Sequence, residues 1–224
     1  MAGAVIIGAG PGIGRSVALR FAREGQPIAL IARNERNLKD MAPAVSGLGV
    51  QVTTHIADTT DEPALRSALD AAIETHGLPD AVIYNAAIIQ QDTAGQLSAQ
   101  GHLDAWAVNV VGALTAAAHI APLMAERGNG SFIITSGMPE PKRDYVSLSL
   151  GKSGVRTLVT LLDQEYGPSG VHLASVTVAG PVAPGTDFAP DDIADHYWRL
   201  HTQPRGNWRQ EALHNARPQP APAT

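Results

Sequence analysis

Three glycines near the N-terminus have the spacing of a turn that binds a phosphate group. Gly8, Gly12 and Gly14 follow the pattern G-x-x-x-G-x-G, with Ile13 where the commoner G-x-G-x-x-G pattern has a glycine. They stand between an apolar segment and an amphipathic one, so they predict a tight turn whose backbone approaches a pyrophosphate at a helix N-terminus. We predict that Gly8, Gly12, Ile13 and Gly14 bind a dinucleotide; the alternative is a plain turn.

The end of the second apolar segment, Ile28–Ala32, indicates which dinucleotide binds. NAD is normally held by an acidic residue about 20 residues beyond the glycine turn. Here Ala32 takes that place, followed by Arg33 and Asn34. A guanidinium can hold the 2′-phosphate of NADP with two charge-assisted hydrogen bonds. We predict that Arg33 and Asn34 contact the cofactor and that NADP(H) is preferred over NAD(H); the alternative for Arg33 is a solvated loop residue.

Alternating apolar and amphipathic segments must position these residues. The short apolar segments predict strands at Ala4–Ile7, Ile28–Ala32, Val50–Ile56, Ala81–Tyr84, Phe132–Thr135 and Val171–Val178. Apolar residues at helical spacing predict helices at Arg15–Glu24, Asn37–Val45, Pro63–Thr75, Leu103–Glu126, Ser153–Tyr166 and Asp192–His201. This order is typical of an α/β fold, a Rossmann-type doubly wound parallel sheet with helices on both faces. We expect a single domain over residues 1–216, a last strand at Asn207–Leu213 and a disordered tail at Arg217–Thr224.

Composition excludes several classes of function. The chain has 224 residues, a formal net charge of −5 and no cysteine, so disulfides, thiolate nucleophiles and cysteine metal sites are excluded. No metal site is predicted, and mild acidity gives no electrostatic signal for nucleic acid or an anionic membrane. No basic stretch precedes the first apolar segment and no apolar run approaches the ~20 residues of a membrane span, so we expect a cytoplasmic protein.

Further motifs follow the predicted strands in order. They are Asp58-Thr59-Thr60-Asp61, Tyr84-Asn85-Ala86-Ala87, Trp106-Ala107-Val108-Asn109, Ser131-Phe132-Ile133-Ile134-Thr135-Ser136 and Gly180-Pro181-Val182. With the glycine turn, this series resembles the short-chain dehydrogenase/reductase family over nearly the whole chain. The resemblance implies that the cofactor is bound by Asp58, Thr59, Asn85, Ala86, Gly180 and Pro181. It also implies catalytic roles for Asn109 and Ser136, with Ser136 steadying the substrate oxygen.

The family's catalytic motif, Y-x-x-x-K, is only half present. Lysines and arginines number sixteen together, yet only three are lysines, and one of these, Lys152, falls where the motif has its lysine. The resemblance implies that Lys152 holds the nicotinamide ribose. Four residues earlier, Leu148 stands where the family has the tyrosine that passes the proton. A leucine cannot donate a proton, so the chemistry of this site must differ from the family pattern.

Tyr145 is the first candidate replacement for the missing tyrosine. Ser147 and Ser149 are further candidates, but a serine hydroxyl is a poor acid unless a chain of water supplies the proton. Tyr145 precedes Lys152 by seven residues, which puts it on the same side of a continuous helix but ~10 Å along the axis instead of ~6 Å. A bend before the helix would bring Tyr145 into the site. The alternative is a partly exposed loop tyrosine.

Together these features predict an NADP(H)-dependent oxidoreductase with a modified proton-donor site, acting on a small-molecule carbonyl, imine or enone. The alternative is a protein of the same fold that binds NADP(H) as a sensor or assembly partner without redox chemistry. The resemblance and the run Ala116-Ala117-Ala118 imply a homo-dimer or homo-tetramer packed through the long helices. Tyr197 and Trp198 either line the substrate pocket or pack in the core, and we assign Trp198 to the core.

Overall fold

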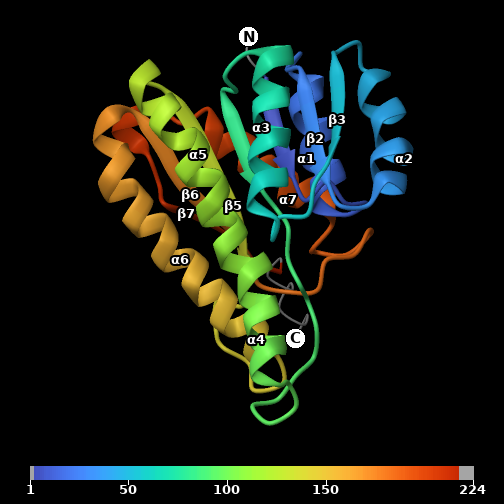
Figure 1. The fold of residues 1–224 in the computed structure, drawn as a ribbon, viewed down its shortest axis with the longest axis vertical. Coiled ribbons are helices and arrows are strands. Elements are labelled where there is room, and N and C mark those ends of the chain that lie inside the picture. The colour runs from blue at the N-terminus through green and yellow to red at the C-terminus, as the bar shows by residue number, and fades with distance from the viewer. Residues whose placement is uncertain (1–2, 217–224) are drawn as a thin grey trace, which may run out of the picture.

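A seven-stranded parallel sheet forms the centre of the protein (Figure 1). The structure, a computed structural model, describes residues 3–216, so the predicted tail Arg217–Thr224 lies outside the described residues. The strands are β1 (Ala4–Ile7), β2 (Ile28–Ala32), β3 (Val52–Ile56), β4 (Ala81–Tyr84), β5 (Gly130–Gly137), β6 (Val171–Val178) and β7 (Glu211–His214). Their order is β3-β2-β1-β4-β5-β6-β7, and every pair is parallel. The strand order reverses between β1 and β4, where open α/β sheets bind their ligands. The predicted fold class is confirmed.

Helices cover both faces of the sheet because alternate strand residues point to opposite sides. Val5 and Ile7 pack with α3 (Glu62–His76), α5 (Gly112–Arg127) and α6 (Val146–Tyr166). Ala4 and Ile6 pack on the other face with α1 (Ile13–Arg23), α2 (Glu35–Ser46) and α7 (Pro190–His201). The remaining helix, α4 (Ala99–Trp106), packs against α6 and runs into α5 through a π-helical turn, η1 (Ala107–Val111).

One helix boundary differs from the predicted one in a way that matters for the site. The helix predicted at Ser153–Tyr166 begins seven residues earlier, at Val146. Its first turn is capped by a residue distant in sequence, because the buried Asp92 carboxylate accepts hydrogen bonds from the Ser147 amide at 2.9 Å and the Ser147 hydroxyl at 3.0 Å. Local sequence carries no signal for such a cap, yet it places Leu148 and Lys152 on one helix.

The long stretch Ala99–Arg127 contributes mainly to the core. Within residues 3–216, only this stretch is long and apolar enough to cross a membrane, judged by length and composition alone. It packs against α3, α6 and β5, and 56% of its most apolar window is buried. Ala116 and Ala117 are fully buried inside this molecule's own core, whereas Ala118 is exposed, so of this run only Ala118 is available to a second subunit.

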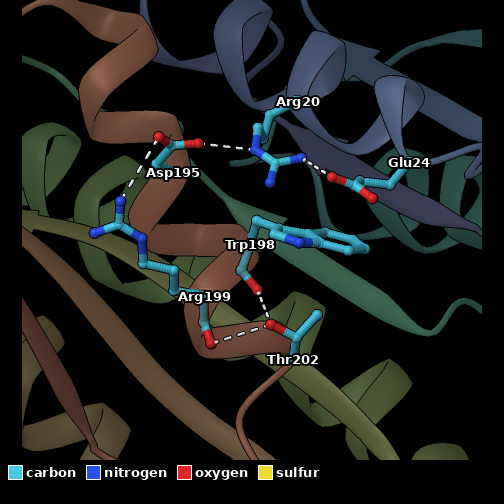
Figure 2. A network of polar contacts seen from close by, with 6 residues as sticks. All are labelled: Arg20, Glu24, Asp195, Trp198, Arg199 and Thr202. Carbon is cyan, nitrogen blue, oxygen red and sulfur yellow. Dashed lines mark hydrogen bonds and ion pairs between the residues drawn. The ribbon is translucent and has the colours of Figure 1, made fainter.

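A polar network fixes α7 against α1 (Figure 2). The Arg20 guanidinium donates through Nε to Asp195 Oδ1 at 2.8 Å and lies over the Trp198 ring, 5.2 Å from its centroid. Trp198 packs at the edge of the core, and Tyr197 is fully buried within it. The two aromatic residues therefore belong to the core, and the Arg20–Asp195 contact links α7 to α1.

Candidate functional site

One large cavity lies at the carboxyl ends of the central strands. Its volume is about 1070 Å³, enough for a dinucleotide and a small substrate. Of the residues predicted from sequence, Gly14 and Asn109 are absent from the cavity wall. The wall contains Gly8, Gly12, Ile13, Arg33, Asn34, Asp58, Thr59, Asn85, Ala86, Ser136, Tyr145, Lys152, Gly180 and Pro181. The fold thus brings residues from across the whole chain to one site.

The glycines of the turn have different structural tasks. Gly8 has φ +83°, and a Cβ there would lie 2.3 Å from the backbone nitrogen of Ala86, so only glycine lets the ends of β1 and β4 approach. A Cβ on Gly14 would lie 2.6 Å from the Gly8 carbonyl oxygen, where α1 packs on the turn. A Cβ on Gly12 would meet nothing within 4 Å. Gly8 and Gly14 therefore build the turn, and Gly12 lies against open space at the cavity wall.

The loops after β2 and β3 bring opposite charges to one end of the cavity. Arg33 has a 70% exposed side chain and lies 3.9 Å from Asp58 Oδ2 through Nη1. Hydrogen bonds from Thr60, and then the Arg33 charge, hold the pKa of Asp58 below its usual value. The Asn34 side chain accepts hydrogen bonds from the Arg36 and Asn37 amides, so its oxygen caps α2. This end carries an accessible guanidinium beside an ionised carboxylate.

A chain of polar contacts crosses the base of the cavity. Asn85 Nδ2 donates to the Gly8 carbonyl at 3.0 Å, and Thr135 Oγ1 donates to Asn85 Oδ1 at 2.8 Å. The Tyr197 hydroxyl lies 2.6 Å from Thr135 Oγ1. These contacts tie the glycine turn to β5 and then to α7. Asn85 is therefore locked in orientation at the centre of the site.

The other end of the cavity holds a hydroxyl and an amine. Lys152 is 5% exposed and donates through Nζ to the Thr135 carbonyl at 2.8 Å. Burial lowers the pKa of Lys152 to about 8. Ser136 Oγ is buried at the cavity wall with no hydrogen-bond partner among the described residues. Leu148, one turn before Lys152 on α6, is 4% exposed and also lines the cavity.

Tyr145 lines the cavity, whereas Asn109 does not. Tyr145 stands immediately before α6 with φ −147° and ψ 53°, so the chain bends there and brings its side chain to the cavity wall. Its hydroxyl accepts a hydrogen bond from Gln91 Nε2 at 3.1 Å. Asn109 instead lies in the π-helical turn behind the wall, where both ends of its amide bond the Ile88 backbone. The Asn109 side chain therefore anchors the loop after β4 from behind the wall, and its catalytic role stays a prediction.

Several wall residues were missed by sequence reasoning. Thr135 was not predicted as a site residue, although it lies next to Ser136 at the end of a predicted strand, where ligand-binding residues are common. Met138 has φ +47°, the one positive value at a non-glycine residue in the described chain, and such strain often marks functional sites. Arg156 Nη1 donates to the carbonyls of Gly137 and Met138 at 3.0 and 3.3 Å, which holds this bend beside Ser136.

The ionisable groups of the wall define what chemistry is available. They are Arg33, Asp58, Glu140, Lys142, Tyr145 and Lys152. Within residues 3–216, no cluster of three histidine, aspartate or glutamate side chains is placed to hold a metal ion. The cavity combines one end suited to phosphate with another suited to proton and hydrogen-bond chemistry at a substrate oxygen or nitrogen.

Comparison with known sequences agrees with this architecture. A family model described as short chain dehydrogenase matches residues 2–192. A short-chain dehydrogenase/reductase of Armillaria gallica is 28% identical over 213 residues, covering 93% of this chain and 78% of its own. The probable oxidoreductase EphD of Mycobacterium tuberculosis is 30% identical over 195 residues, which cover 81% of this chain but only 33% of EphD. The chain therefore spans about a third of that larger relative.

Solved structures share the fold at low sequence identity. An alcohol dehydrogenase from the archaeon Thermococcus sibiricus, complexed with 5-hydroxy-NADP, superposes with a TM-score of 0.85 at 24% identity, covering 94% of each chain. A metagenomic short-chain oxidoreductase in complex with NADP gives a TM-score of 0.86 at 23% identity and covers 95% of this chain and 96% of its own. At these identities the likeness establishes the fold.

Proposed function

Because the chain belongs to the short-chain dehydrogenase family, a family of oxidoreductases, we propose that it is an NADP(H)-dependent enzyme acting on a small carbonyl, imine or enone. The observation that carries this proposal is a single cavity. It joins the glycine turn at Gly8 and Gly12 to Ser136 and Lys152 without interruption. A protein that merely bound a nucleotide would have no need of the buried hydroxyl at the far end.

The residues of the cavity fit a nicotinamide dinucleotide. In our proposal the pyrophosphate lies over the turn of Gly8, Gly12 and Ile13, at the N-terminus of α1. Arg33 holds the 2′-phosphate, since its guanidinium is exposed at the cavity wall. The remaining residues that we propose contact the cofactor are Asn34, Asp58, Thr59, Asn85, Ala86, Gly180 and Pro181. When bound, the nicotinamide ring supplies or accepts a hydride.

At the reacting end, three side chains have proposed roles. The Ser136 hydroxyl holds the substrate oxygen or nitrogen, which would satisfy its unpartnered Oγ. Lys152 holds the nicotinamide ribose. Tyr145 is the proton donor: its oxygen accepts from Gln91, so its own proton is not used in that bond and is available to the cavity.

Cofactor titration and a substrate panel test the proposal. NADPH and NADH are titrated separately while the fluorescence of the reduced nicotinamide is followed, and NADPH is expected to bind at least about tenfold more tightly. Consumption of NADPH is then measured with carbonyl, imine and enone compounds. Tighter binding of NADH would show that Arg33 does not read the 2′-phosphate, and no binding of either cofactor would contradict the proposal.

Leu148 is the observation that favours a second candidate function. Replacing the proton donor by a leucine on the cavity wall is the change expected of a protein that retains the nucleotide but has lost redox chemistry. We propose this NADP(H)-binding sensor or assembly protein as the alternative. Tight NADPH binding without turnover of any compound in the panel would favour it.

We also propose that the protein forms a homo-dimer or homo-tetramer. Large apolar side chains remain exposed on α4, α5 and α6, namely Leu103, Trp106, Leu114, Leu123, Leu150 and Leu161. Pairing of these surfaces would bury them in a second copy. Light scattering coupled to gel filtration measures the assembly, and a monomer at micromolar concentration would contradict it.

A further inference from the structure

We propose that Tyr197, which lies outside the cavity wall, is a positioning residue whose hydroxyl fixes Thr135 and thereby the two cofactor-facing groups of Asn85 and Lys152. This inference rests on the proposed function, because the groups it positions are those assigned to the cofactor. It comes from the polar chain Tyr197–Thr135–Asn85–Gly8, in which every distance lies between 2.6 and 3.0 Å.

The direction of each hydrogen bond in this chain follows from chemistry. The Gly8 carbonyl can only accept, so the Asn85 amide must present its Nδ2 there and its Oδ1 to Thr135. Oδ1 also only accepts, so the single Thr135 hydroxyl proton points to Asn85. Thr135 Oγ1 can then only accept from Tyr197, whose hydroxyl is the donor at 2.6 Å. The directions are thus set from the Gly8 carbonyl outward, and Tyr197 supplies the hydrogen bond that anchors Thr135 at the far end of the chain.

Thr135 has its central place because of strand register. β4 ends at Tyr84, which pairs with Ile134, so Thr135 is the first residue of β5 beyond the end of its neighbour. Its carbonyl accepts from Lys152 Nζ at 2.8 Å, and its side chain donates to Asn85. Through its carbonyl and its side chain, Thr135 therefore contacts both groups that we assign to the cofactor.

Tyr197 is suited to hold Thr135 rigidly. It is fully buried, and burial raises its pKa well above the ordinary value, so the hydroxyl keeps the proton that it donates. Its helix is fixed to α1 two residues earlier, through Asp195 and Arg20 (Figure 2). The ring cannot turn away without disturbing the core around it.

The same two elements carry a second contact that serves as a control. Ser131 and Thr135 lie four residues apart on β5, and His201 and Tyr197 lie four apart on α7. Ser131 Oγ contacts His201 Nδ1 at 2.8 Å, at the end of β5 far from the cavity. Both Ser131 and Thr135 thus link β5 to α7, but only Thr135 also bonds Asn85 and Lys152.

Four variants test the inference by separating cofactor affinity from stability. Tyr197→Phe removes the donor and keeps the ring, and Ser131→Ala removes the control contact. Each loses one buried hydrogen bond, so we expect both to lower Tm by about 2–4 °C. Only Tyr197→Phe should raise the NADPH Kd, by about 3–10-fold. Thr135→Val should raise the NADPH Kd by about tenfold or more. Thr135→Ser keeps the hydroxyl, so its NADPH Kd should stay within about twofold of that of the unmodified protein.

The outcomes distinguish this inference from the proposed function. If the unmodified protein does not bind NADPH, the proposed function fails before the variants are compared. If the unmodified protein binds NADPH and Tyr197→Phe binds it equally tightly, the positioning role is overturned. If Tyr197→Phe and Ser131→Ala weaken NADPH binding by the same factor, the role is overturned as well, because the effect would then come from general loosening of α7 against β5.

Discussion

The two ends of the cavity are built in different ways. At the end with the glycine turn, which we propose binds phosphate (the phosphate end), backbone shape builds the site: Gly8 and Gly14 permit approaches that a Cβ would block at 2.3 and 2.6 Å. At the reacting end, individual side chains carry it, with Ser136, Lys152 and Tyr145 each supplying one polar group. The first end keeps its expected residues, whereas the second has Leu148 where the resemblance implies an acid. In the proposed function, cofactor binding and proton transfer are therefore separable, so that one could change while the other is kept.

Putting a phenol back at the reacting end should give the largest effect. Leu148→Tyr places a hydroxyl one turn from Lys152 on the same helix and against the same cavity. A positioned general acid contributes about 10²–10⁴-fold in all, so we expect carbonyl reduction with NADPH to rise by up to about that factor, and by less the more effectively Tyr145 already donates the proton. Steady-state kinetics on a simple ketone and an aldehyde measures it.

Leu148→Phe is the matched control for this change, since it introduces the ring without the hydroxyl. The gain should be absent there. If Leu148→Tyr gave no gain on carbonyls and abolished turnover of an imine or enone that the unmodified protein accepts, the site would be one adapted to a different substrate.

Replacing Arg33, at the other end of the cavity, should have a smaller effect, and only on the affinity for the cofactor. Arg33→Ala should weaken NADPH binding by about 10–100-fold, because up to two charge-assisted hydrogen bonds to the 2′-phosphate are lost. NADH lacks that phosphate, so its Kd should change by less than about threefold. Arg36→Ala removes an 89% exposed guanidinium nearby on α2 that does not line the cavity, and it should leave both affinities unchanged. Equal weakening of NADH and NADPH by Arg33→Ala would contradict the assignment.

The phosphate end was the easier one to predict from sequence, for a physical reason. A glycine turn between a strand and a helix is a local feature, and parallel strands then bring Arg33 and Asp58 to the same edge. Strand and helix periods likewise predicted most elements within two or three residues. These elements could be predicted because they depend on contacts between residues close in sequence and on apolar residues that recur along one face of a strand or helix.

The reacting end depends on contacts between distant residues, which periodicity does not encode. The start of α6 is fixed by Asp92, 55 residues before Ser147. Thr135 is held by Tyr197, 62 residues later, and nothing near either residue indicates the contact. Asn109 likewise makes a contact that local sequence does not indicate, because its amide bonds the backbone of Ile88, 21 residues earlier, behind the wall.

Lys152 gives the smallest predicted effect, on stability and its pH dependence. Burial lowers the pKa of this amine from 10.5 to about 8, so at pH 7 the folded protein holds a charge that the unfolded chain solvates better. Lys152→Met removes that penalty at the cost of the hydrogen bond to Thr135. We expect the free energy of unfolding at pH 7 to rise by about 1–2 kcal/mol, measured by urea denaturation.

The sign of the pH dependence identifies the cause. Between pH 8 and 10.5 the native protein has released the Lys152 proton and the unfolded chain still binds it, so the unmodified protein gains stability as pH rises. Lys152→Met has no such group, and its advantage should therefore shrink from pH 7 to pH 10. Lys39→Met, which removes an exposed lysine of α2, controls for the loss of one charge. An advantage that stayed constant or grew over this range would show that the gain comes from better packing of methionine instead of relief of a buried charge. In that case Lys152 would resemble the glycines of the phosphate end, a position chosen for shape, and the contrast between the two ends would weaken.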